Sequence, residues 1–236
     1  MFGVYDYSFQ WEEERICLGI ERKDNFLLYY RKSQEGSLEK IIGEKGGRLI
    51  INPVEPLNLP KEITPYLEFH FRPVVIQPDS KQTIFLKFPV EICVFLEANN
   101  TYNVLDIFSF STPKYALYGN PDKGMITRHI ETAVFDRIPE LDPLVEGVMV
   151  LTIQNTSRTW VEVTRAVFEN IDLNIFYGDF VAMEGRMEVF SQDLAETMTL
   201  KSPLQEDMKL AIPLFTARQI LLPDKLTFLM EFGVGD

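Results

Sequence analysis

The sequence is poor in the residues that most often carry chemistry. It contains two cysteines and two histidines among 236 residues. Cys17 and Cys93 are too few for a disulfide framework and lack the close spacing of a metal site. Both lie in apolar, strand-like segments, where a buried free thiol is the ordinary state. We therefore expect two reduced thiols and no metal.

Catalytic motifs are also missing. The sequence has no G-x-S-x-G, Walker loop, Rossmann fingerprint, H-E-x-x-H or paired C-x-x-C. The glycine-rich stretch Gly43–Arg48 leads into a strand-like segment instead of a helix N-terminus, so we interpret it as a turn. A Ser-His-acid triad around His129 is conceivable, but nothing identifies its serine, and His70 alternates with aromatic residues as an ordinary strand histidine does. The absence of motifs favours a non-enzymatic protein, and we assign no catalytic residue and no cofactor.

Long apolar runs and basic patches are absent as well. Runs such as "VMVL" and "CVFL" are far shorter than the roughly 18 residues that a membrane helix needs. The N-terminus lacks the pattern of a signal peptide. A formal net charge of −12 repels phosphate backbones and anionic headgroups. We therefore expect a cytoplasmic protein without membrane insertion and without nucleic acid as a partner.

What the sequence does contain is alternation of apolar and polar residues between turn signals. This pattern predicts an all-β protein, with two antiparallel β-sandwich (immunoglobulin-like) domains in tandem. The segment Phe135–Gly147 lacks alternation, which places the expected domains at residues 1–138 and 145–236; a single extended sandwich is the alternative. One short helix is expected in Ser191–Met198, with Ser191 as its cap.

The stretch "KYALYGNPDKGMITRHIE", residues 114–131, predicts a β-hairpin around Asn120–Gly124. With a loop of Pro121–Gly124, Tyr118 would face Thr127 and Ala116 would face His129. Period two then gives one polar face, which carries Tyr118, Thr127, His129 and Glu131.

The other face of this hairpin is apolar except for one residue. It carries Tyr115, Leu117, Ile126, Arg128 and Ile130, so it should meet the core. A buried guanidinium needs a carboxylate or carbonyl partner, and Arg128 is therefore expected to be a buried ionic residue.

Residues in and after this stretch resemble a known family. The run of Lys114–Tyr115 and Leu117–Gly119, with Gly124 and Arg128 beyond it, is similar to an uncharacterised archaeal protein family, a domain of unknown function that spans nearly the whole chain. That resemblance implies no reaction and no cofactor, and it implies a prokaryotic cytoplasmic setting.

The sequence therefore favours a binding or adaptor module that recognises a partner protein or small ligand through the hairpin face. Tyr118, Lys123, Thr127 and His129 are the expected binding residues. The strand edges leave self-association of the chain open.

Two further hypotheses involve carboxylates. One is a carbohydrate-active sandwich, either a binding module or a two-carboxylate hydrolase, with Glu162, Glu184 and Glu188 as candidates. The other is a calcium site formed by Asp136, Glu140, Asp142 and Glu146, for which a solvated acidic linker is the simpler interpretation.

Overall fold

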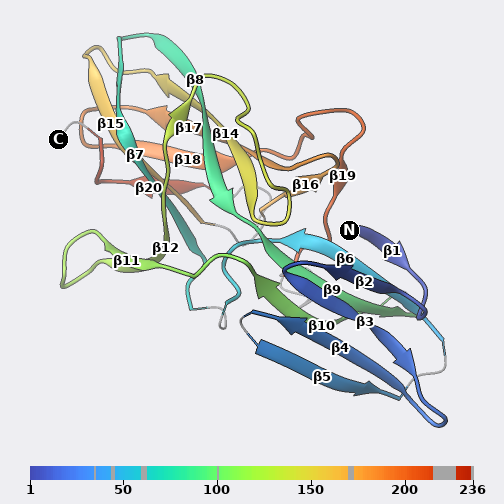
Figure 1. The fold of residues 1–236 in the computed structure, drawn as a ribbon. Coiled ribbons are helices and arrows are strands. Elements are labelled where there is room, and N and C mark those ends of the chain that lie inside the picture. The colour runs from blue at the N-terminus through green and yellow to red at the C-terminus, as the bar shows by residue number, and fades with distance from the viewer. Residues whose placement is uncertain are drawn as a thin grey trace. The chain divides into compact units, whose positions relative to one another are not determined.

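The computed structural model describes residues 1–34, 36–43, 46–59, 63–99, 101–169, 173–214 and 227–234. Every regular element in these residues is a β-strand, which confirms the all-β prediction. The strands form four open sheets (Figure 1). By their contacts they divide into two compact units, and each is described by itself.

Unit 1 comprises Met1–Asn52 and Cys93–Ile107 and contains two four-stranded sheets. One sheet has the order β1-β6-β9-β10, and the other has the order β2-β3-β4-β5. Their strands are β1 (Gly3–Tyr5), β2 (Gln10–Glu13), β3 (Ile16–Arg22), β4 (Leu27–Ser33), β5 (Gly36–Ile42), β6 (Arg48–Val54), β9 (Glu91–Ala98) and β10 (Thr101–Ser109).

A buried polar contact joins the two sheets of unit 1. The Tyr29 hydroxyl on β4 donates a hydrogen bond of 2.8 Å to the Asp106 carboxylate on β10. The Arg31 Nε donates a second bond of 2.6 Å to the same carboxylate. Tyr29 and Asp106 are both buried, so this carboxylate is satisfied by a neutral donor and by a charge.

Unit 2 comprises Pro53–Ile92 and Phe108–Asp236 and contains the other two sheets. The smaller has the order β11-β12-β7-β15, and the larger has the order β13-β8-β14-β17-β16-β19, with β18 between β17 and β20. Their strands are β7 (Tyr66–Ile76), β8 (Ser80–Pro89), β11 (Tyr115–Tyr118), β12 (Met125–Glu131), β13 (Val134–Phe135), β14 (Glu146–Asn155), β15 (Val161–Glu169), β16 (Phe176–Tyr177), β17 (Val181–Val189), β18 (Ala195–Thr199), β19 (Lys209–Leu210) and β20 (Phe228–Met230).

The two sheets of unit 2 pack with their apolar faces together. Phe168 of β15 lies over Gly185 of β17, where an added Cβ would come within 2.9 Å of the phenylalanine ring. Phe69 of β7 meets Phe168 edge to face, with ring centroids 6.1 Å apart. Buried aromatic residues from one sheet thus fill the space above a glycine of the other.

Three details of this fold differ from the prediction. The pairs β12–β7 and β14–β17 are parallel and not antiparallel, and in each pair the chain makes the long crossover connection that parallel neighbours require. The helix expected in Ser191–Met198 is wrong. Residues 195–199 form β18, and pairing with β17 and β20 outweighs the local cap signal of Ser191.

The expected domain boundary lies inside unit 2. Strand β8, which precedes the segment 138–145, pairs along its length with β14, which follows that segment. The units are instead divided within three strands: after Asn52 in β6, after Ile92 in β9 and after Ile107 in β10. An immunoglobulin-like character of either unit stays a prediction.

Candidate functional site

The stretch singled out in the sequence forms the hairpin of β11 and β12, whose loop projects from its sheet (Figure 1). The carbonyl of Asn120 accepts hydrogen bonds from the amides of Lys123, at 3.1 Å, and Gly124, at 2.5 Å. Its side chain accepts a bond of 3.1 Å from the amide of Asp122. The predicted turn is thus confirmed, with the asparagine bonding two residues ahead.

The register of this hairpin differs from the expected one by two residues. Tyr118 lies opposite Met125, and Ala116 lies opposite Thr127. The chain therefore turns through Gly119–Gly124 and not through Pro121–Gly124 alone. Because side chains alternate with period two, a shift of two residues leaves every side chain on its expected face.

The polar face, however, is not a free surface. Tyr118 is 3% exposed and Thr127 is 0% exposed, whereas Lys123 in the loop is exposed. The Tyr118 hydroxyl lies 3.1 Å from both the amide and the carbonyl of Phe232, whose ring packs against it. The expectation that Tyr118 and Thr127 face a partner is therefore corrected: the segment Phe228–Gly233 covers that end of the sheet.

A buried carboxylate organises this covered face. Glu68 of β7 accepts a hydrogen bond of 2.5 Å from the Thr127 hydroxyl and one of 3.3 Å from Arg165 of β15. Arg165 in turn is confined by Gly233, which has φ +88° and where a Cβ would lie 2.0 Å from the arginine side chain. These contacts tie three strands of the sheet together through one anion.

The two histidines of the chain lie beside this network. His70 and His129 have ring centroids 5.9 Å apart, and His129 Nδ1 lies 3.8 Å from Glu68. Nδ1 of His129 and Nε of Arg165 are buried without a hydrogen-bond partner in the described part of the chain. Buried polar atoms of this kind suit an intervening water molecule with two or more polar neighbours.

Arg128 is buried on the opposite, apolar face, and its partner is a carboxylate. Its guanidinium lies 3.2 Å from Glu91, and it packs over the ring of Tyr115 with a centroid distance of 5.4 Å. Burial raises the pKa of Glu91 to about 7, although the amide of Asn58 and the charge of Arg128 both lower it. This pair is enclosed, so it braces the fold and does not offer a surface.

A small cavity of about 270 Å³ opens next to the hairpin. Lys114 and His129 line it together with Ser111, Glu131 and residues of the β8–β14 pair. The Lys87 ammonium there is neutralised by Glu146 at 2.6 Å. Of the expected binding residues, only His129 reaches this cavity; Tyr118, Thr127 and Lys123 do not line it.

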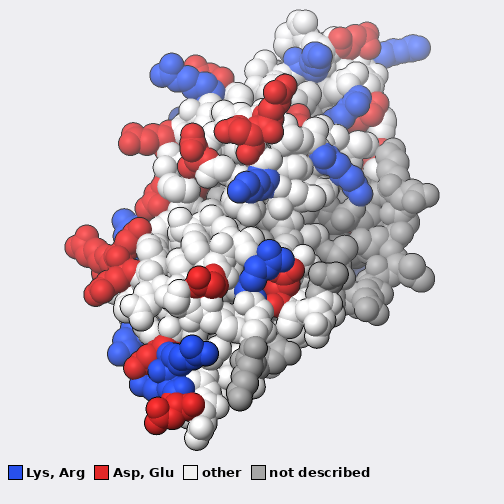
Figure 2. Space-filling model, turned by 90° about the vertical axis from the view of Figure 1, so that its right-hand side faces the viewer, with Lys and Arg blue, Asp and Glu red and all other residues white. Residues whose placement is uncertain are grey.

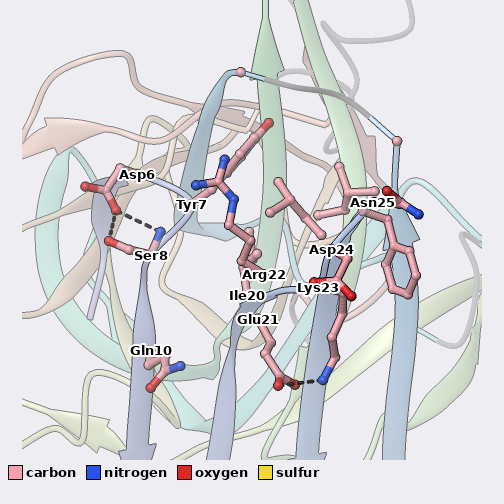
Figure 3. Close-up of a pocket in the computed structure, with 15 residues that line it drawn as sticks. Asp6, Tyr7, Ser8, Gln10, Ile20, Glu21, Arg22, Lys23, Asp24 and Asn25 are labelled. Carbon is pink, nitrogen blue, oxygen red and sulfur yellow. Dashed lines mark hydrogen bonds and ion pairs between the residues drawn. The ribbon is translucent and has the colours of Figure 1, made fainter.

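Unit 1 contains a cavity that was not expected from the sequence. It is a cavity of about 910 Å³ at one end of the unit, which we call the turn cavity (Figure 3). Its lining residues are Asp6, Tyr7, Ser8, Gln10, Ile20, Glu21, Arg22, Lys23, Asp24, Asn25, Phe26, Leu27, Ile42, Gly43 and Gly46. They come from the turn before β2, the β3–β4 turn and the segment between β5 and β6, together with the adjoining ends of β2, β3, β4 and β5.

The turns around this cavity are held by local hydrogen bonds. The amide of Ser8 donates a hydrogen bond of 2.9 Å to the Asp6 carboxylate, and the Ser8 hydroxyl donates a second one to the same oxygen. These two hydrogen bonds lower the pKa of Asp6. The amide of Lys23 donates a hydrogen bond of 2.9 Å to the carbonyl of Phe26, and this bond closes the β3–β4 turn. The sequence held no signal that three turns distant in sequence surround one cavity.

The carboxylates singled out in the sequence do not form the sites that were expected of them. Glu184 and Glu188 lie on β17, whereas Glu162 lies on β15 in the other sheet. In the described ranges no three histidine, cysteine or acidic residues are grouped so that they could hold a metal ion. Asp142 instead accepts the amide of Leu144 at 3.1 Å within a turn.

Charges on the surface are mixed. On the face shown in Figure 2, lysine and arginine side chains lie singly or beside acidic ones and form no continuous basic patch. Among the described residues, no helix is long and apolar enough to cross a membrane.

Fold and site together define an all-β chain of open sheets, with buried ionic networks in unit 2 and a polar cavity in unit 1. The chain belongs to the family described as "Protein of unknown function (DUF432)", whose model matches residues 1–231. The resemblance to a domain of unknown function is thereby confirmed, and the family description indicates no activity. No curated protein and no solved structure matches the chain.

Proposed function

We propose that this protein is a non-enzymatic binding module that takes a small polar ligand into the turn cavity of unit 1. The supporting observation is the cavity itself, because its volume of about 910 Å³ lies in the range of small-molecule sites. Its lining combines apolar side chains with carboxylates, amides and basic groups, which is the composition that orients a polar ligand.

The cavity is also more suitable than the buried networks of unit 2. Glu68, Thr127, Glu91 and Arg128 are all less than 3% exposed, and their polar groups are largely directed at one another. A ligand would have to break these contacts, and an unpaired buried charge is costly. At the turn cavity, by contrast, the polar side chains are already at the surface.

A bulky substitution at the rim tests this proposal. Asn25 lines the cavity, is exposed and makes no side-chain hydrogen bond with a described residue, so Asn25→Trp should fill space without loss of stability. We expect the variant to lose at least about tenfold in affinity for any ligand found in a thermal-shift screen of amino acids, dipeptides, nucleotides and disaccharides.

Glu14→Trp is the matched control, because Glu14 is an exposed turn residue of the same unit outside the cavity. Equal ligand affinity in both variants and the wild type, by calorimetry, would place binding elsewhere. A screen without any binder would remove the support for the proposal. Binding of disaccharides alone would favour the carbohydrate-binding alternative.

The hairpin supports a second candidate function, recognition of a partner protein. Leu117 and Ile126 are cross-strand partners near its tip, and they are 49% and 51% exposed. In the order of its sheet β11 is an edge strand, so its outer backbone groups can pair with an extended segment. Exposed Lys114 and Lys123 flank the strand, which favours an acidic, extended peptide as the occupant.

A substitution that places a charge near the tip of the hairpin tests this second candidate function. Leu117→Asp should abolish binding of such a peptide and leave the unfolding midpoint nearly unchanged, because the side chain is half exposed. Val75→Asp is the control, since Val75 is 59% exposed on another strand of the same sheet. If an acidic fluorescent peptide binds all three proteins equally, or none of them, the hairpin is not its receptor.

A further inference from the structure

Among the residues that the structure describes, only part of the charge around the turn cavity is neutralised. Lys23 pairs with Glu21 at 2.5 Å. The side chain of Arg22, the last residue of β3, makes no hydrogen bond or ion pair with any residue that the structure describes, and neither does the side chain of Asp24. Within the described part of the chain, the Asp6 carboxylate is bonded only to Ser8, through one of its two oxygens.

Arg22 and Asp6 line the same cavity without pairing with each other. Figure 3 shows the Arg22 side chain turned toward Tyr7 and the Asp6–Ser8 turn, whereas Lys23 turns the other way, to Glu21. Opposite charges that share a cavity attract each other, so a separation beyond ion-pair distance leaves room for a group between them. A ligand with both signs of charge would satisfy each of them at once.

We propose that the ligand of the turn cavity is a small zwitterion of the amino acid or dipeptide class, with its carboxylate on Arg22 and its ammonium group on Asp6. A guanidinium holds a carboxylate with two parallel hydrogen bonds, which fixes orientation as well as charge. The free oxygen of Asp6 is an acceptor for an ammonium group. This inference rests on the proposed function, because it names the ligand class of the same cavity.

The apolar part of the lining suits the body of such a ligand. Tyr7, Phe26, Leu27 and Ile42 line the cavity together with the charged residues. Phe26 is 38% exposed, so its ring is available for contact. Burial of apolar surface contributes roughly 25 cal/mol per Å², which favours a dipeptide with an apolar side chain over a bare amino acid.

The experiment uses glycyl dipeptides with each of the common amino acids at the second position, first by thermal shift on the full chain. The dipeptide with the largest shift is then compared by calorimetry with its N-acetylated form, its C-terminal amide and maltose. Arg22→Gln and Asp6→Asn are the test variants. Asp6→Asn keeps an acceptor for the Ser8 bonds, and Arg158→Gln, an exposed arginine of unit 2, is the control.

Each charge should be matched to one variant. We expect Arg22→Gln to lower the affinity for the free dipeptide at least about tenfold. Its affinity for the C-terminal amide should equal that of the wild type, because the amide lacks the carboxylate. Asp6→Asn should lower the affinity for the free dipeptide by a similar factor. Its affinity for the N-acetylated form should equal that of the wild type, because this form lacks the ammonium group. Arg158→Gln should bind all forms as the wild type does.

The outcomes separate the two proposals. If the blocked forms bind as well as the free dipeptide, or if maltose binds and no dipeptide does, the zwitterion is wrong and the turn cavity remains a ligand site. If dipeptides bind equally to the wild type and to Asn25→Trp, the cavity is not the site and the proposed function fails. If no glycyl dipeptide shifts the unfolding midpoint, the zwitterion inference is overturned.

Discussion

At the scale of single residues, the charges of unit 2 show how burial governs ionisation. Glu91 is 0% exposed. It accepts a hydrogen bond of 2.8 Å from the amide of Asn58 and also contacts Arg128. Loss of hydration disfavours its charged form more than these partners favour it, so its pKa rises from 4.5 to about 7. An acid whose pKa is raised on folding holds its proton more tightly in the native state.

This shift makes stability depend on pH. The contribution of Glu91 is fully present below its ordinary pKa of 4.5 and is lost as the pH rises through about 7. The difference in free energy of unfolding between the wild type and Glu91→Gln should therefore decrease between pH 4.5 and 7.5, by up to about 3 kcal/mol. Urea unfolding of both proteins at several pH values measures it. A difference that increases with pH would mean that Arg128 keeps Glu91 ionised.

The sequence predicted part of these contacts and not the rest. Arg128 stands out among apolar neighbours on one hairpin face, and this alone predicts a buried arginine with a carboxylate partner. Nothing local identifies that partner, because Glu91 lies 37 residues away along the chain. The burial of Tyr118 and Thr127 was missed for the same reason. Thr127 is bonded to Glu68 of another strand, and the segment that packs against Tyr118 begins at Phe228, far along the chain.

At the scale of elements, a glycine decides how closely the two sheets of unit 2 approach. Gly185 on β17 lies under the ring of Phe168, and its would-be Cβ also lies 3.2 Å from the sulfur of Met149. All three residues belong to the core between the sheets, where side chains interdigitate closely. Alternation in the sequence predicted these strands, but it could not tell which strands share a sheet or which face each other.

A methyl group at this position should therefore be destabilising. Gly185→Ala forces either the Phe168 ring or β17 to move, and overpacking of this kind costs about 1–3 kcal/mol. Gly178→Ala is the control, because its nearest neighbour is at 3.6 Å, an ordinary contact distance. Thermal unfolding should show a midpoint lowered by several degrees for Gly185→Ala. Equal midpoints for the two variants would contradict the close approach.

At the scale of the whole molecule, the chain builds units that are discontinuous in sequence. Residues 93–107, which follow the first strands of unit 2 along the chain, complete one of the two sheets of unit 1. A search for linkers along the chain could not find this, because the boundaries lie within strands and not within flexible segments. The turn cavity was missed likewise, since it depends on turns that meet only after the sheets have formed.

Protein-observed NMR of the full chain decides whether the turn cavity is the ligand site. A library of small polar fragments, zwitterions included, is added to ¹⁵N-labelled full-length protein, and amide shifts are mapped onto the structure. We expect perturbations to cluster on the residues that line the cavity, namely 6–8, 10, 20–27, 42, 43 and 46, and we expect Asn25→Trp to remove them. Shifts that cluster on unit 2, or fragments that perturb no residue of unit 1, would contradict it.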